Sequence, residues 1–184
     1  MLRALLSRQI DAFERRWTYD ASYLREVLAV SPWALLKFFV VGSLGHGRRA
    51  PSEAVAAAGI VGALTEDCGP CTQLGIDMAR RGGVAGDVLP AILAGDEASM
   101  GETAALSRRF ARAVLARDME GADPLRGEIE RRWGRGALVD IALALTTARM
   151  YPTLKYALGH GKACARLTVE GEAARIERPA ALAA

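Results

Sequence analysis

The sequence predicts an all-α protein, and three observations lead to that prediction. Apolar residues recur at spacings of three and four through nearly every segment of the 184-residue chain, which is the period of an amphipathic helix. Residues that start or end helices, such as Ser31 before Pro32 and the pair Gly82-Gly83, separate these segments. The alternation of apolar and polar residues that is typical of a β-strand allows one short strand, in RLTVE at 166–170.

The composition is that of one folded domain without a strong charge. Apolar residues make up 51% of the chain, which excludes global disorder. The 24 basic and 21 acidic residues are interspersed, so nothing indicates nucleic-acid binding. Three cysteines do not make a secreted disulfide scaffold, and the most apolar windows, 33–44 and 54–64, are too short to span a bilayer. We see no signal-peptide pattern and expect a cytoplasmic protein without membrane contact.

Three helices are expected ahead of a glycine-rich break. The first spans 2–17, the second begins after a capping Asp20, and the third covers 33–44. The stretch GSLGHGRRAP then interrupts the helical pattern. We therefore divide the chain into an N-terminal helical appendage, 1–45, and a main helical domain, 46–184.

The main domain is expected to begin with a buried central helix. The stretch AVAAAGIVGAL, at 54–64, is apolar on all sides, and its alanines and glycines let neighbouring helices approach closely. A second helix starts at the cysteine pair and ends at Gly82-Gly83, and a short element follows at 86–94.

Three further helix boundaries follow from local signals. Ser99 and Glu102 form a capping-box pattern before one helix, and Asp123-Pro124 is expected to start the next. A long helix from about residue 137 is expected to be kinked or broken at Pro152. The C-terminal RPAALAA is expected to fray.

The sequence CGPC at 68–71 is the chemical centre of the chain. Thioredoxins share this tetrapeptide, but no strand precedes it here, which argues against their fold. Pro70 fits only the first turn of a helix, so Cys68 lies near the N-cap and Cys71 about one turn in. The N-terminal N–H groups stabilise a thiolate, and the spacing allows a disulfide. We expect Cys68 to be the more exposed thiol with the lower pKa and Cys71 to be more buried. The alternatives to a redox role are an inert cysteine pair or half of a metal site.

The surroundings of the motif resemble the alkylhydroperoxidase-D (AhpD)-like family, which is related to carboxymuconolactone decarboxylase. The resemblance covers 50–118: an alanine-rich helix running into DCGPC, an amphipathic helix ending in Gly-Gly, and then GVAGDVLPAILAGDEASM. It implies an AhpD-like helical bundle that forms homo-oligomers, as a dimer, trimer or hexamer. It also implies that the cysteine pair reduces peroxides or exchanges disulfides without a cofactor. A dithiol or a lipoyl protein would then be the reductant that regenerates the pair.

The sequence departs from the family at two positions. Peroxidase members carry a histidine and a glutamate that relay protons to the second cysteine, which is Cys71 here; those positions are Gly75 and Ala56. The resemblance makes Cys71 the attacking thiol, whereas the helix-terminus argument favours Cys68. Both assignments stay open, and enzymatic activity is expected but not fixed by the sequence.

Other polar residues are candidates to replace the relay. Glu66, two residues before the pair, is a candidate proton acceptor, and Gln73 and Asp77 are polar groups on the same helix. His46 is interpreted as an exposed loop residue, with the alternative that its loop folds over the cysteines as a substitute base.

Metal binding is the second way to use the pair. His160 and Cys164 are four residues apart and with the two cysteines would complete a set of ligands suited to structural zinc. The alternative to the redox protein is therefore a non-catalytic helical oligomer, in which the CxxC is a redox sensor or a metal ligand.

Overall fold

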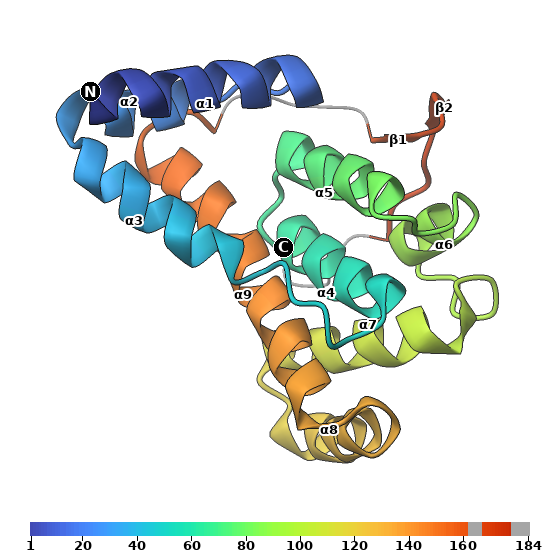
Figure 1. Ribbon diagram of the computed structural model, residues 1–184. Coiled ribbons are helices and arrows are strands. Elements are labelled where there is room, and N and C mark those ends of the chain that lie inside the picture. The colour runs from blue at the N-terminus through green and yellow to red at the C-terminus, as the bar shows by residue number, and fades with distance from the viewer. Residues whose placement is uncertain (162–166, 178–184) are drawn as a thin grey trace.

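The computed structural model describes residues 1–161 and 167–177 and shows a mostly helical protein (Figure 1). The helices are α1 (Leu2–Trp17), α2 (Ser22–Val30), α3 (Pro32–Ser43), α4 (Ser52–Thr65), α5 (Gly69–Arg81), α6 (Val88–Ala94), α7 (Gly101–Ala116), α8 (Met119–Trp133) and α9 (Arg135–Ala157). The expected strand is half of a small antiparallel hairpin, β1 (Thr168–Val169) and β2 (Glu172–Ala173). The tail from 178 onwards lies outside the described residues.

Helix α4 lies in the centre of the main body, as its apolar sequence predicts (Figure 1). It packs against α5, α7 and α9, and half of its residues are buried. Small residues make the contact with α9 close: a Cβ atom added at Gly62 would lie 2.9 Å from the backbone oxygen of Leu145. The α4–α9 contact is therefore backbone against backbone at this point, with no room for a side chain.

The three N-terminal helices pack on the main body through their own apolar cluster. Large side chains such as Leu6, Ile10 and Tyr23 are buried there. The same cluster takes in Leu74 from α5 and Leu154 from α9. The N-terminal helices therefore contact the cysteine helix directly.

The loop between α3 and α4 is tied down by one buried carboxylate. Asp140 of α9 is only 3% exposed and accepts hydrogen bonds from the backbone N–H groups of Arg49, at 2.6 Å, and Ala50, at 3.4 Å. A buried carboxylate needs such donors. These bonds fix the end of the loop that carries His46.

Two helix starts differ from the sequence prediction. The capping box before α7 does not form, because the Ser99 hydroxyl donates to Asp96 at 2.6 Å and Met100 is the N-cap residue. Helix α8 starts five residues earlier than expected, under an Asp118 cap whose carboxylate accepts from the Gly121 N–H at 2.9 Å. Pro124 therefore lies inside α8, where it removes one N–H donor without ending the helix.

Helix α9 begins at Arg135 and is not broken at Pro152, which is buried within it. Packing on both sides of the proline outweighs the one lost hydrogen bond. Helix α2 begins at Ser22, and Asp20 accepts from the Ser22 N–H at 2.9 Å, so the expected cap acts just ahead of the helix.

The outer surface of the N-terminal helices carries exposed apolar side chains. Trp33 is 65% exposed and Val40 60%, both on α3. None of the helices in the described ranges is long and apolar enough to cross a membrane. The expected homo-oligomer stays a prediction, which light scattering during size-exclusion chromatography would check.

Candidate redox site

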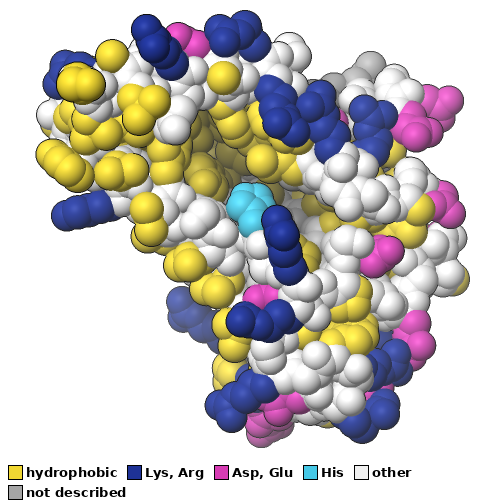
Figure 2. Space-filling model, viewed as in Figure 1, with side chains coloured by type: hydrophobic (Ala, Val, Ile, Leu, Met, Phe, Trp, Pro, Cys, Tyr) yellow, Lys and Arg dark blue, Asp and Glu magenta, His cyan; other side chains and the backbone are white. Residues whose placement is uncertain are grey.

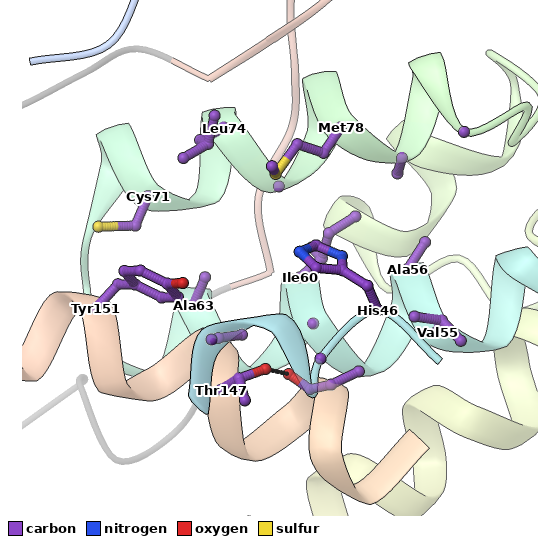
Figure 3. Close-up of a pocket in the computed structure, with 18 of the residues that line it drawn as sticks. His46, Val55, Ala56, Ile60, Ala63, Cys71, Leu74, Met78, Thr147 and Tyr151 are labelled. Atoms are coloured by element: carbon purple, nitrogen blue, oxygen red, sulfur yellow. Dashed lines mark hydrogen bonds between the residues drawn. The ribbon is translucent and has the colours of Figure 1, made fainter. Parts of the chain in front are cut away.

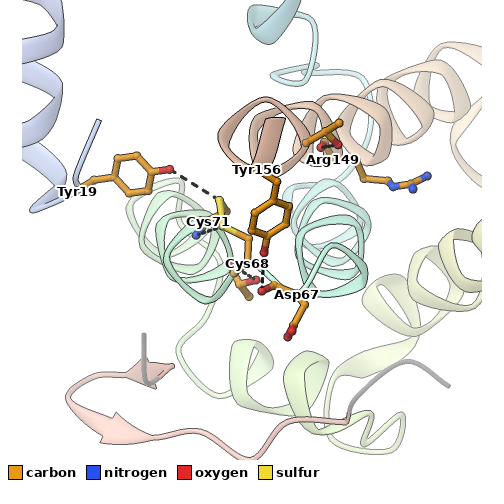
Figure 4. The surroundings of a disulfide bond; sticks show 8 residues. Tyr19, Asp67, Cys68, Cys71, Arg149 and Tyr156 are labelled. Carbon is orange, nitrogen blue, oxygen red and sulfur yellow. Dashed lines mark hydrogen bonds between the residues drawn. A yellow bond between two sulfur atoms is a disulfide. The ribbon is translucent and has the colours of Figure 1, made fainter. Parts of the chain in front are cut away.

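Cys68 and Cys71 form a disulfide at the start of α5 (Figure 4). Cys68 is the N-cap residue: its sulfur accepts from the backbone N–H of Cys71 at 3.3 Å. Pro70 fits in the first turn, where a proline costs no helical hydrogen bond. The Cα atoms are 5.2 Å apart, within the range that a disulfide needs. The predicted N-cap placement of the pair is confirmed.

The predicted exposure of the two sulfurs is wrong. Cys68 is 3% exposed and Cys71 8%, so neither is a surface thiol and Cys68 is the more buried residue. The turn before α5, where Asp67 has a φ of 50°, packs against the end of α9. There the Tyr156 hydroxyl donates to the Asp67 carbonyl oxygen at 2.8 Å (Figure 4). The helix end that a free α5 would expose is therefore covered.

Cys71 opens onto a cavity of about 540 Å³ (Figure 3). Its walls come from α4, α5 and α9, together with residues of α1 to α3 and their connections, and include Ile60, Leu74, Met78 and Tyr151. This size and apolar character are typical of small-molecule sites. Cys71 is among the lining residues and Cys68 is not, so Cys71 is the cysteine that a molecule in the cavity approaches.

The two relay positions of the resembling family also line this cavity. Gly75 lies one turn after Cys71, and Ala56 faces the cavity from α4. A Cβ atom added at Gly75 would have no neighbour within 4 Å. Open space at Gly75 and the methyl group of Ala56 therefore stand where the resemblance implies a histidine and a glutamate.

A tyrosine from the N-terminal helices contacts Cys71 instead. Tyr19, between α1 and α2, places its hydroxyl 3.7 Å from the Cys71 sulfur (Figure 4). A disulfide sulfur carries no proton, so the hydroxyl is the donor in this state. Burial raises the pKa of Tyr19, which keeps the phenol protonated at neutral pH. Sequence analysis missed this residue, because no local pattern links it to a cysteine 52 residues away.

A buried lysine lies near the ring of Tyr19. Lys155 of α9 is 2% exposed, and its Nζ atom is 5.4 Å from the centre of the Tyr19 ring, a cation–π distance. Burial lowers the pKa of Lys155, partly offset by Asp20. The lysine therefore carries its charge at a cost to the fold.

This cost predicts a pH effect on stability. The pKa of Lys155 is lower in the folded protein than in the unfolded chain, where it is about 10.4. Below about pH 10.4 the unfolded chain therefore binds more protons than the folded protein, and the free energy of unfolding falls as the pH drops. We expect Lys155→Met to remove that fall, so the variant gains stability relative to wild type between pH 10 and 7. Urea unfolding at several pH values measures the difference; parallel pH curves would contradict the prediction.

The three acidic and amide candidates near the pair have other contacts. Glu66 accepts from the Arg149 guanidinium of α9 at 2.5 Å. Gln73 holds the hairpin: its side chain donates to the Thr168 oxygen at 3.0 Å and accepts from the Thr168 N–H at 2.8 Å. It also donates to Asp77 at 3.1 Å. The role of Glu66 as a proton acceptor stays a prediction, whereas Gln73 anchors β1 to α5.

The two histidines have different surroundings. His46 is exposed, as expected, and also lines the cavity, with its ring pointing inward (Figure 3). His160 is held by α2, with Nδ1 3.0 Å from the Ser22 hydroxyl and Nε2 2.9 Å from the Glu26 carboxylate. Cys164, the remaining residue of the zinc alternative, lies outside the described residues. Within residues 1–161 and 167–177 no group of three potential metal ligands occurs.

Fold and site together define a helical protein with a covered disulfide that faces an apolar cavity. Comparison with protein-family models, curated proteins and solved structures found no match to this chain. The likeness to AhpD-like proteins therefore rests on the sequence features described above. The function is argued from the site.

Proposed function

We propose that this protein is a thiol–disulfide redox protein of the AhpD-like type, which uses Cys68 and Cys71 to reduce peroxides or exchange disulfides. The observation that carries the proposal is that, of two bonded cysteines, one lines the cavity and the other does not. Cys71 lines the cavity, and Cys68 lies behind it at bonding distance. In this proposal Cys71 meets the substrate and Cys68 resolves the product.

The reaction with a hydroperoxide ROOH would start from the reduced pair. The Cys71 thiol loses its proton, and the thiolate attacks the terminal peroxide oxygen. The O–O bond breaks, the departing alkoxide takes up a proton to give ROH, and Cys71 becomes a sulfenic acid. The Cys68 thiol then attacks that sulfur, releasing water and forming the disulfide. A dithiol, such as the lipoyl protein that the resemblance implies, would reduce the disulfide and become oxidised in turn.

With a disulfide substrate the same groups would act in the same order. The Cys71 thiolate attacks one substrate sulfur and forms a mixed disulfide, releasing the other sulfur as a thiol. Cys68 then displaces the bound half. The Cys71 N–H beside the Cys68 sulfur and the Tyr19 hydroxyl beside Cys71 are the hydrogen-bond donors that support negative charge on the pair.

Replacing Tyr19 with phenylalanine tests the role of its hydroxyl. We expect the rate of Cys71 alkylation by iodoacetamide at pH 7 to fall by roughly 3- to 10-fold, the value of one hydrogen bond to the thiolate. The pH profile of alkylation should move to higher pH. Tyr151→Phe is the matched control, because Tyr151 lines the same cavity with no hydrogen bond to either sulfur. Equal profiles for wild type and Tyr19→Phe would exclude the role.

The non-catalytic alternative has one observation in its favour: the relay positions Gly75 and Ala56 hold no proton-transfer group. In that case the CxxC would be a redox sensor or a metal ligand of a helical oligomer. The redox potential, measured by thiol trapping in dithiothreitol or glutathione buffers with metal analysis on the same sample, separates the two. A reversible disulfide in metal-free protein, followed by turnover with a hydroperoxide and a dithiol, supports the enzyme. Thiols that stay reduced, or about one zinc per chain, would favour the alternative.

A further inference from the structure

We infer that the cavity beside Cys71 binds a single-chain amphiphile of medium length, with its carboxylate at Arg48 and His46 and its hydrocarbon chain reaching toward Cys71. This inference names the substrate class of the proposed redox site and rests on that function for the chemistry at Cys71. The binding itself needs no redox step, so it is tested separately.

The interior of the cavity is suited to a hydrocarbon chain. Side chains of α4 and α5, including Val55, Ile60, Leu74 and Met78, face it (Figure 3). At about 30 Å³ for a water-sized group, 540 Å³ corresponds to roughly eighteen heavy atoms. Carboxylates with eight to twelve carbons are smaller than this. Burying their methylene groups would supply the affinity, at about 0.8 kcal/mol for each.

Glycines keep the cavity open. Gly59 of α4 and Gly75 of α5 both line it, and a Cβ atom added at either position would meet nothing within 4 Å. A glycine inside a helix is less stable than alanine by about 0.5–1 kcal/mol. The space is therefore maintained although filling it would stabilise both helices.

The rim of the cavity carries positive charge. Among the lining residues that the structure describes, Arg48 and His46 are the ionisable bases, and no aspartate or glutamate occurs. Figure 2 shows a hollow walled by hydrophobic side chains, with a histidine and basic side chains at its edge. An anionic head group would meet attraction from Arg48 there, and no carboxylate is among the described lining side chains.

Arg48 is available to a ligand, whereas its neighbour is engaged. Arg49 lies 3.8 Å from the Asp140 carboxylate and donates its backbone N–H to the same group. Arg48 has no ion-pair partner within the described part of the chain. The Asp140 bonds hold the backbone next to Arg48 in place, which keeps this residue at the rim of the cavity. Its planar donors match the geometry of a carboxylate.

Calorimetric binding of decanoate to the oxidised, metal-free protein tests the inference, with decanol as the neutral probe. We expect decanoate to bind at least about tenfold more tightly than decanol, because only decanoate has a charged head group that can pair with Arg48. Arg48→Gln should remove most of that difference. Arg49→Gln, with the same loss of net charge, should leave it unchanged. Equal binding of the two probes, or equal effects of the two variants, would overturn the assignment of the head group.

Filling the cavity gives an independent test. Gly59→Leu should abolish decanoate binding while the helical circular dichroism and the unfolding midpoint stay at or above wild-type values. Absence of decanoate binding to wild type, or unchanged binding to Gly59→Leu, would overturn the inference. Cys71→Ser should still bind decanoate. Hydroperoxide turnover without decanoate binding would contradict this inference but not the proposed function. Decanoate binding without hydroperoxide turnover would support the binding site and contradict the peroxidase function.

Discussion

Replacing Cys71 with serine is expected to reduce hydroperoxide consumption by at least about 10³-fold, because a serine hydroxyl stays protonated and is a poor nucleophile. The substitution is nearly isosteric, so the fold should persist. Cys71 is the cysteine that lines the cavity. Stopped-flow consumption of an organic hydroperoxide by the pre-reduced protein measures the loss.

The matched variant is Cys68→Ser, which keeps the attacking sulfur and removes the resolving one. We expect it to consume one equivalent of hydroperoxide and stop, with Cys71 trapped as a sulfenic acid that mass spectrometry detects. The reverse pattern, with a single turnover in Cys71→Ser and none in Cys68→Ser, would assign the attack to Cys68. It would then support the helix-terminus argument over the cavity.

A single added methyl group is expected to lower the stability of the fold markedly. Gly62→Ala would place a Cβ atom 2.9 Å from the Leu145 backbone oxygen and 3.3 Å from the Ala148 Cβ atom. Helices α4 and α9 would have to separate, which we expect to lower the free energy of unfolding by about 1–3 kcal/mol. Urea unfolding monitored by circular dichroism measures this change.

Gly59→Ala is the control for Gly62→Ala, because it lies in the same helix and faces the cavity. A Cβ atom there has no neighbour within 4 Å, so the variant should gain about 0.5–1 kcal/mol from better helix propensity. If the free energy of unfolding rises in Gly59→Ala and falls in Gly62→Ala, the α4–α9 contact decides the effect, because the two glycines are only three residues apart. Equal effects would contradict the close packing.

Much of the helical architecture can be predicted from the sequence, because local signals determine it. The Ser31 hydroxyl accepts from the Ala34 N–H at 3.1 Å, so the predicted start of α3 is confirmed. The buried α4 follows from a segment that is apolar on all sides. The cap at Cys68 follows from the position of Pro70.

The predictions that failed depend on contacts between distant segments. The exposure of Cys68 was inferred as if the start of α5 faced solvent, whereas the end of α9 covers it. Pro124 and Pro152 carry local signals for a helix boundary, but both lie inside helices that packing and a better cap extend past them. Tyr19 meets Cys71 only because the N-terminal helices fold back over α5.

The burial of both sulfurs also determines how the pair would respond to its chemical surroundings. With at most 8% of either cysteine exposed, a bulky thiol in solution has little direct access to the disulfide. Exchange needs in-line approach of a thiolate to sulfur, so the rate depends on entry as much as on reduction potential. The oxidation state of the Cys68–Cys71 pair would therefore be set by molecules small enough to enter the cavity. Exchange with other thiols in solution would be slow.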